Sequence, residues 1–116
     1  MSSITERAWA AGFYDGEGSS SRNKGSFVLS ISQKDYRPLA RFAAAFDVEI
    51  AIYDNRLFDI RLTGEKAFHV LHAMWPYLSE PKKEQARRVL WATHEVRSRR
   101  FPKINWVYDY ALVWTH

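Results

Sequence analysis

The stretch Ala10-Ala11-Gly12-Phe13-Tyr14-Asp15-Gly16-Glu17-Gly18 decides the fold of this chain. It closes a helix predicted from about Ile4 to Tyr14, which the capping-box pattern Ser3-Ile4-Thr5-Glu6 begins. Two acids therefore stand at the carboxyl end of a helix, where the helix dipole disfavours negative charge. The pattern predicts a positive partner nearby, and a hard divalent cation held by carboxylate oxygens is one candidate. The alternative is a glycine-rich turn whose acids are merely exposed.

Small residues recur on the same helix at every fourth position, at Ala8, Gly12 and Gly16, with Ala11 beside them. A row of this kind leaves a smooth groove that another backbone can approach closely. We therefore expect this helix to pack against a second backbone.

Composition restricts the class of protein. With 116 residues, 47% of them apolar, the chain suits one domain, 1–116, with a sizeable core. The net charge of +4 leans toward a polyanionic partner. The absence of cysteine excludes disulfides and thiolate metal sites. No apolar run approaches the roughly 18 residues of a membrane helix, and no signal peptide is evident, so we expect a soluble intracellular protein without membrane association.

Two hairpins follow the first helix. Residues 26–33 alternate apolar and mostly polar side chains, as in a half-buried strand, and residues 19–23 precede them across a Lys24-Gly25 turn. Residues 48–53 and 57–62 alternate in the same way around the turn at 54–56. The sequence therefore predicts four strands in two hairpins.

Helices are predicted between and after the hairpins. Asp35 can cap one helix, and Thr63 can cap another that runs from 65 to about 75. A further helix is expected at about 81–97, and a last one at 105–114. The order α-β-β-α-β-β-α-α predicts an α+β fold with one four-stranded antiparallel sheet and helices on one face.

The nine residues quoted first resemble the LAGLIDADG motif of homing endonucleases, in the variant that ends Asp-Gly-Glu-Gly, with Ala10 in place of the leading Leu. The order of elements from about 4 to 97 is also that of the family, whereas the aromatic, helical extension at about 101–116 lies outside the resemblance. The resemblance implies the LAGLIDADG endonuclease fold, with a saddle-shaped sheet and two motif helices packed in a homodimer. It implies a dimer interface at Ala8, Ala11, Gly12, Asp15 and Gly16.

The resemblance also implies catalytic residues. It places the metal at Glu17 and Gly16, and gives Asp15 a structural rather than a metal-binding role. Gln33 stands where the family often has a polar residue that contacts a metal-bound water. Arg37 stands where a basic residue often lies near the scissile phosphate, and Lys82 matches a lysine thought to act as a Lewis acid or to assist water activation. Taken singly, these three also fit a strand end, a surface charge and a solvated side chain.

The polar faces of the hairpins form the expected DNA-binding surface, because Arg, Asn and Asp can read base edges in the major groove and serines can act through water. An ordinary solvated sheet face is the alternative. The expected contacts are Ser21, Arg22, Asn23, Lys24, Ser26, Ser30, Ser32 and Lys34 from the first hairpin, and Tyr53, Asn55, Arg56, Asp59 and Arg61 from the second.

These expectations together describe a homodimeric, sequence-specific endonuclease that cuts double-stranded DNA at a long pseudo-palindromic site with Mg²⁺ or Mn²⁺. The rival hypothesis is a non-cleaving nucleic-acid-binding protein on the same fold, either an RNA-splicing maturase or a DNA-binding regulator. His69 and His72 lie three apart on a predicted helix, but no third metal ligand accompanies them, and we assign them no role.

Overall fold

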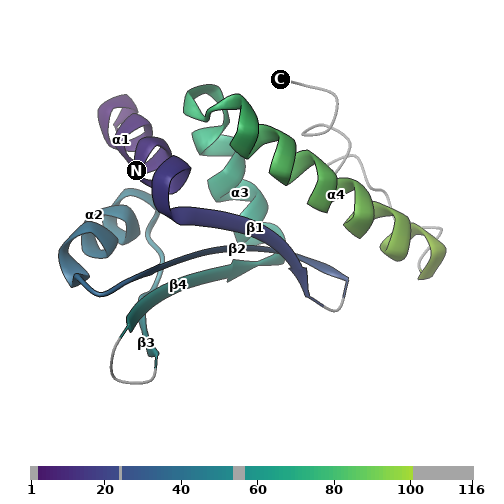
Figure 1. Cartoon of the computed structure of the whole chain (residues 1–116), viewed down its shortest axis with the longest axis horizontal. Helices are drawn as coiled ribbons and strands as arrows, with labels where there is room; N and C mark the ends of the chain where they lie inside the picture. The colour runs from purple at the N-terminus through teal and green to yellow at the C-terminus, as the bar shows by residue number, and fades with distance from the viewer. Residues whose placement is uncertain (1–2, 24, 54–56, 101–116) are drawn as a thin grey trace.

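The computed structural model describes residues 3–23, 25–53 and 57–100. A four-stranded antiparallel sheet in the order β1-β2-β4-β3 carries the helices on one face (Figure 1). This confirms the predicted α+β class. The elements are α1 (Ile4–Glu17), β1 (Gly18–Asn23), β2 (Ser26–Gln33), α2 (Tyr36–Phe46), β3 (Ala51–Tyr53), β4 (Leu57–Thr63), α3 (Gly64–Met74), the 3-10 turn η1 (Trp75–Tyr77) and α4 (Glu80–Arg100).

Helix α1 begins where its sequence predicts and ends later than expected. The Ser3 hydroxyl accepts the N–H of Glu6 at 3.1 Å and caps the first turn. The expected end at Tyr14 is wrong, because the helix continues through Glu17 and Gly18 is its C-cap, with an N–H that bonds the Tyr14 carbonyl. Gly16 therefore lies inside the helix. A side chain at Gly18 would collide with the ring of Tyr14, so this position requires glycine.

The first hairpin matches its prediction, and the second is shorter. Strand β2 spans the expected residues, whereas the strand expected at 48–53 is reduced to β3. Helix α2 ends in a left-handed residue, Asp47 (φ 52°), and the N–H of Val48 bonds the carbonyl of Ala43 at 3.1 Å. Val48 and Ile50 then pack against the core from this connection. Their alternation thus reflects loop packing rather than strand pairing.

The later helices also differ from the sequence-based bounds. Thr63 precedes α3, but its hydroxyl makes no capping hydrogen bond, because the left-handed Gly64 (φ 59°) redirects the chain at that point. Helix α4 is longer than the expected 81–97. The last predicted helix, at 105–114, lies outside the described residues. Among the described helices, none is long and apolar enough to cross a membrane.

The core lies between one face of the sheet and the helices. Phe27, Leu29 and Ile31 of β2 alternate toward this face and are fully buried. Phe27 stacks on Phe68 of α3 at 5.4 Å between ring centroids. The other residues of each strand point to the opposite face of the sheet. The pairing of β1, β2 and β4 therefore determines which polar side chains lie together on that face.

Replacing Gly18 tests the end of α1. Gly18→Ala is expected to lower the free energy of unfolding by about 1–3 kcal/mol, because the new methyl group must displace the buried Tyr14 ring. Urea denaturation measures the change, with Ser21→Ala, an exposed position on the same strand, as the control. Equal stability of the two variants would contradict this account of the helix end.

Candidate nucleic-acid and metal site

The carboxyl end of α1 meets the amino end of α4. The Asp15 carboxylate accepts the N–H of Ser79 at 3.1 Å from each oxygen, and the Ser79 hydroxyl at 3.0 Å. The Lys82 amine donates to the carbonyl of Gly18 at 2.5 Å. For Asp15, the predicted positive partner is therefore within the chain, as the amino end of α4, whereas Lys82 binds a carbonyl at the end of α1.

A buried tyrosine supports this junction. The Lys82 amine lies 5.7 Å from the centroid of the Tyr14 ring, and the Tyr14 hydroxyl shares a 2.7 Å hydrogen bond with Ser20. Burial raises the pKa of Tyr14 to about 12, so its hydroxyl stays neutral across the physiological range. The Ser20 N–H donates to Gln85 at 3.1 Å. Sequence reasoning missed Ser20 and Gln85, although Gln85 follows Lys82 by three residues and so shares its helix face.

Glu17 is exposed at the last position of α1. Gly18, the first residue of β1, pairs with Ile31 near the end of β2. Glu17, just before β1, and Gln33, the last residue of β2, therefore lie at the same end of the sheet. Gln33 lies opposite Phe58, however, and therefore shares the helix-side face of β2 rather than the open face. The structure thus gathers Glu17 and Lys82 at one helix end, with Gln33 at the neighbouring strand end.

Arg37 is engaged locally. Its guanidinium donates to both oxygens of Asp35, at 3.1 and 2.7 Å, and its N–H is capped by the same carboxylate. These hydrogen bonds lower the pKa of Asp35 to about 2. The Arg37 side chain is 88% exposed, so the pair is fully solvated and weak, and it leaves the guanidinium accessible to a phosphate.

The donors of one chain do not complete a metal site. Within the described residues, no three His, Asp or Glu side chains converge. Both oxygens of Asp15 already bind Ser79, which leaves the exposed carboxylate of Glu17. A hard cation takes about six oxygen ligands, so the single-chain donors fit such an ion only together with further ligands from outside the chain.

The small-residue face of α1 is partly open. Gly12 and Gly16 are exposed, and a Cβ built on either would meet no atom of the described residues within 4 Å. Ala8 is half-buried, whereas Ala11 is fully buried in the core of its own chain. The expectation that Ala11 lines a dimer interface is therefore wrong, because it has no surface left to offer.

The other side of α1 is fixed to α2. Trp9 stacks on Phe13 at 5.3 Å, and Arg41 lies over the Trp9 ring at 4.1 Å. Arg41 also pairs with Glu6 at 2.7 Å. The aromatic side of α1 thus packs on α2, whereas the residues that the structure describes leave the glycine side open.

The open face of the sheet carries most of the expected DNA contacts. Ser30 lies opposite Arg61, and Ser32 donates to Asp59 at 2.8 Å. Arg22 pairs with Phe27 and so lies on the helix-side face, apart from the other expected contacts. Lys34 is exposed just after β2. The open face carries Ser21, Asn23, Ser26, Ser30, Ser32, Asp59 and Arg61. Lys24, Asn55, Arg56 and the Tyr53 side chain lie outside the described part of the chain.

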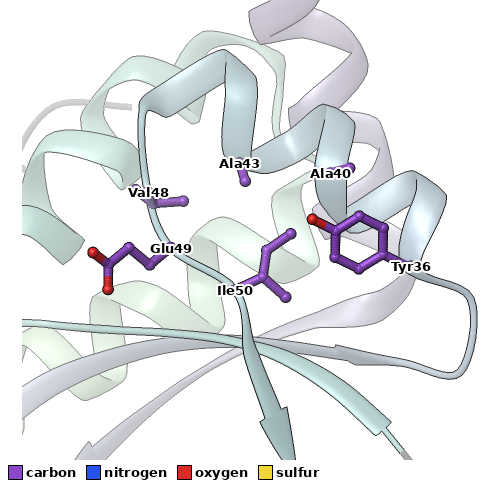
Figure 2. A pocket seen from close by; sticks show the side chains of 6 residues that line it. All are labelled: Tyr36, Ala40, Ala43, Val48, Glu49 and Ile50. Carbon is purple, nitrogen blue, oxygen red and sulfur yellow. The ribbon is translucent and has the colours of Figure 1, made fainter.

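A pocket of about 340 Å³ lies elsewhere, between α2 and the segment that leads into β3 (Figure 2). Its lining consists of Tyr36, Ala40, Ala43, Val48, Glu49 and Ile50. None of the candidate residues lines this pocket.

Comparison with known proteins supports the fold. No protein-family model and no curated protein sequence matches this chain. The crystal structure of the homing endonuclease I-CvuI in complex with its target, with calcium, matches with a TM-score of 0.66 and 19% identity, over 85% of this chain and 72% of that chain. A structure of I-CvuI on the I-CreI target, with magnesium and uncleaved DNA, matches with a TM-score of 0.56 and 17% identity. This match covers 94% of this chain and 73% of that chain. The chain therefore has the fold of these LAGLIDADG endonucleases.

Enlarging Gly12 tests whether its open surface receives a second chain. We expect a wild-type dimer at micromolar concentration, and Gly12→Leu is expected to give a monomer or aggregate, because the leucine would hold two close backbones apart. Multi-angle light scattering measures the mass. Ala44→Leu enlarges an exposed small residue on α2 and serves as the control. A monomeric wild type, with and without DNA, would rule out this interface.

Proposed function

We propose that this chain is a metal-dependent, sequence-specific endonuclease that cuts double-stranded DNA as a homodimer. The observation that carries the proposal is the convergence at the carboxyl end of α1, where exposed Glu17 lies one residue before Gly18, whose carbonyl binds the Lys82 amine. The end of α1 thus brings together an acid and an amine, the two kinds of charge that phosphodiester hydrolysis requires. The LAGLIDADG resemblance and the fold of I-CvuI support the same proposal.

Each side chain has a distinct task in this proposal. Glu17, next to Gly16, would hold Mg²⁺ or Mn²⁺ through its carboxylate, and the ion would activate water and neutralise the phosphate. Gln33 orients the attacking water. Lys82 and Arg37 contribute positive charge where the pentacovalent phosphate and the leaving oxygen develop negative charge.

Two chains are needed because one chain contributes one exposed motif acid and DNA has two strands. Packing along Gly12 and Gly16 brings two copies of Glu17 together and supplies the further ligands that a single chain lacks. The same packing sets two open sheet faces side by side. The dimer then cuts both strands in a staggered manner across the minor groove.

The open face sets the length of the target. Strand β2 has 8 residues. A strand of this length spans roughly 27 Å at about 3.3 Å per residue, or about eight base pairs. Two sheets and a central gap cover a pseudo-palindromic site of roughly twenty base pairs.

Neutralising Glu17 separates an endonuclease from a binding protein. Glu17→Gln is expected to keep the fold and to bind DNA as tightly or more tightly, because negative charge leaves the DNA-facing surface. Cleavage of a site selected from a randomised library is expected to fall by orders of magnitude. Lys82→Ala should also slow cutting, with less effect on binding. Glu49→Gln, an exposed acid away from the junction, is the control.

The measurement is cleavage with Mg²⁺, Mn²⁺, Ca²⁺ and EDTA beside a binding assay. If the wild type and Glu17→Gln bind alike and neither cuts with any divalent metal, the proposal fails and the non-cleaving binding protein replaces it.

Arg61 is expected to contribute to the base preference of DNA binding. Its exposed side chain stands on the open face opposite Ser30, so Arg61→Ala should relax preference at one symmetric pair of positions, by about 1–3 kcal/mol. Arg22→Ala removes the same charge from the other face and should affect all sequences alike. Binding to a library of single-base variants compares them, and a uniform loss for Arg61→Ala would show that this face does not read bases.

A further inference from the structure

We propose that Asp15 is a positioning residue for Lys82. Its carboxylate fixes the amino end of α4, and that fixed end holds the Lys82 amine at the carbonyl of Gly18, the residue that follows Glu17. The catalytic consequence rests on the proposed endonuclease function, whereas the geometric link between the two helix ends does not.

Asp15 binds the residue that starts α4. Three hydrogen bonds join its two oxygens to the N–H and hydroxyl of Ser79, all between 3.0 and 3.1 Å. The carbonyl of Ser79 in turn accepts the N–H of Lys83 at 3.0 Å, which is the first hydrogen bond of the helix. The acid also lies at the positive end of the α4 dipole, where negative charge is favourable. Asp15 therefore fixes both the position and the direction of the first turn of α4.

Lys82 belongs to that first turn. It follows Ser79 by three residues, as Gly18 follows Asp15 by three, and its amine binds the Gly18 carbonyl. Hydrogen bonds thus join residues 15–18 to residues 79–82 at both ends, between Asp15 and Ser79 and between Gly18 and Lys82. A lysine amine sits on a flexible four-carbon stem, so its location depends on the backbone that carries it. A displacement of about 1 Å at a reacting centre can cost on the order of a hundredfold in rate.

The same contacts argue against direct metal binding by Asp15. Both of its oxygens are occupied by Ser79 donors, in contrast to the exposed Glu17. The two roles respond differently to Asn, which keeps an oxygen acceptor but loses the charge. An oxygen that accepts a backbone N–H tolerates Asn, whereas a carboxylate that holds a divalent cation loses the negative charge that contributes much of its affinity.

The test compares Asp15→Ala, Asp15→Asn and Ser79→Ala in the full chain, on the selected DNA site with Mg²⁺. Asp15→Ala is expected to lower kcat by about tenfold or more with KM nearly unchanged, because the amine is misplaced while the DNA-binding face is intact. Asp15→Asn should recover most of the wild-type kcat. Ser79→Ala keeps the N–H contact and should give a smaller loss in the same direction. Glu6→Ala, which breaks an ion pair near the other end of α1, is the control and should leave kcat unchanged.

Hydrogen exchange of the amides of Ser79 and Lys83 provides a readout that does not need cleavage. Exchange should accelerate in Asp15→Ala and remain slow in Asp15→Asn. If the wild type cuts no DNA, the endonuclease proposal fails and the exchange result alone decides the geometric link. If Asp15→Ala does not fold, Asp15→Asn and Ser79→Ala decide the question. An Asn variant as inactive as a Glu17→Gln variant, or an Ala variant with unchanged kcat and exchange, would overturn the role of Asp15.

Discussion

The meeting of two opposite helix ends is the interaction on which the rest of this structure depends. The carboxyl end of α1 is electronegative and the amino end of α4 is electropositive, so their approach is favourable in itself. Hydrogen bonds strengthen it, because Ser79 and Lys82 at the start of α4 donate to the Asp15 carboxylate and the Gly18 carbonyl at the end of α1. Strand β1 begins at Gly18, directly at this junction, and α4 runs along β1 from there (Figure 1). The junction of α1 with α4 therefore positions the start of β1, the exposed Glu17 and Lys82.

Local patterns in the sequence predicted most of the fold. Strict alternation gave the bounds of β2, and the Ser3 and Asp35 caps mark helix starts as expected, because each of these signals lies within a few residues. The errors come from longer-range packing. The apolar residues before β3 pack on the core instead of pairing in the sheet. Helix α1 continues past Tyr14 to Glu17, and its C-cap is Gly18, where only a residue without a side chain fits against the Tyr14 ring.

The candidate site was predicted only in part, for the same reason. The nine-residue motif indicates Glu17, and the order of elements that follows it indicates Lys82. The hydrogen bonds that join the end of α1 to the start of α4, however, link residues 64 positions apart in sequence. No periodicity reveals such a contact, so Ser79 and Gln85 were missed. The strand register likewise assigns Arg22 and Gln33 to the helix-side face, and packing turns Ala11 inward. Residue type and spacing thus indicated the chemistry, and tertiary packing determined which surface each residue can serve.

The most direct test of the account is strand-specific cleavage by mixed dimers of wild type and Lys82→Ala. Each chain is proposed to carry its own junction and to serve one DNA strand. A purified heterodimer bound to an asymmetrically labelled duplex should therefore nick one strand and leave the other largely intact. Cutting of both strands at equal rates by that heterodimer would contradict the claim that the Lys82 of each chain serves one DNA strand.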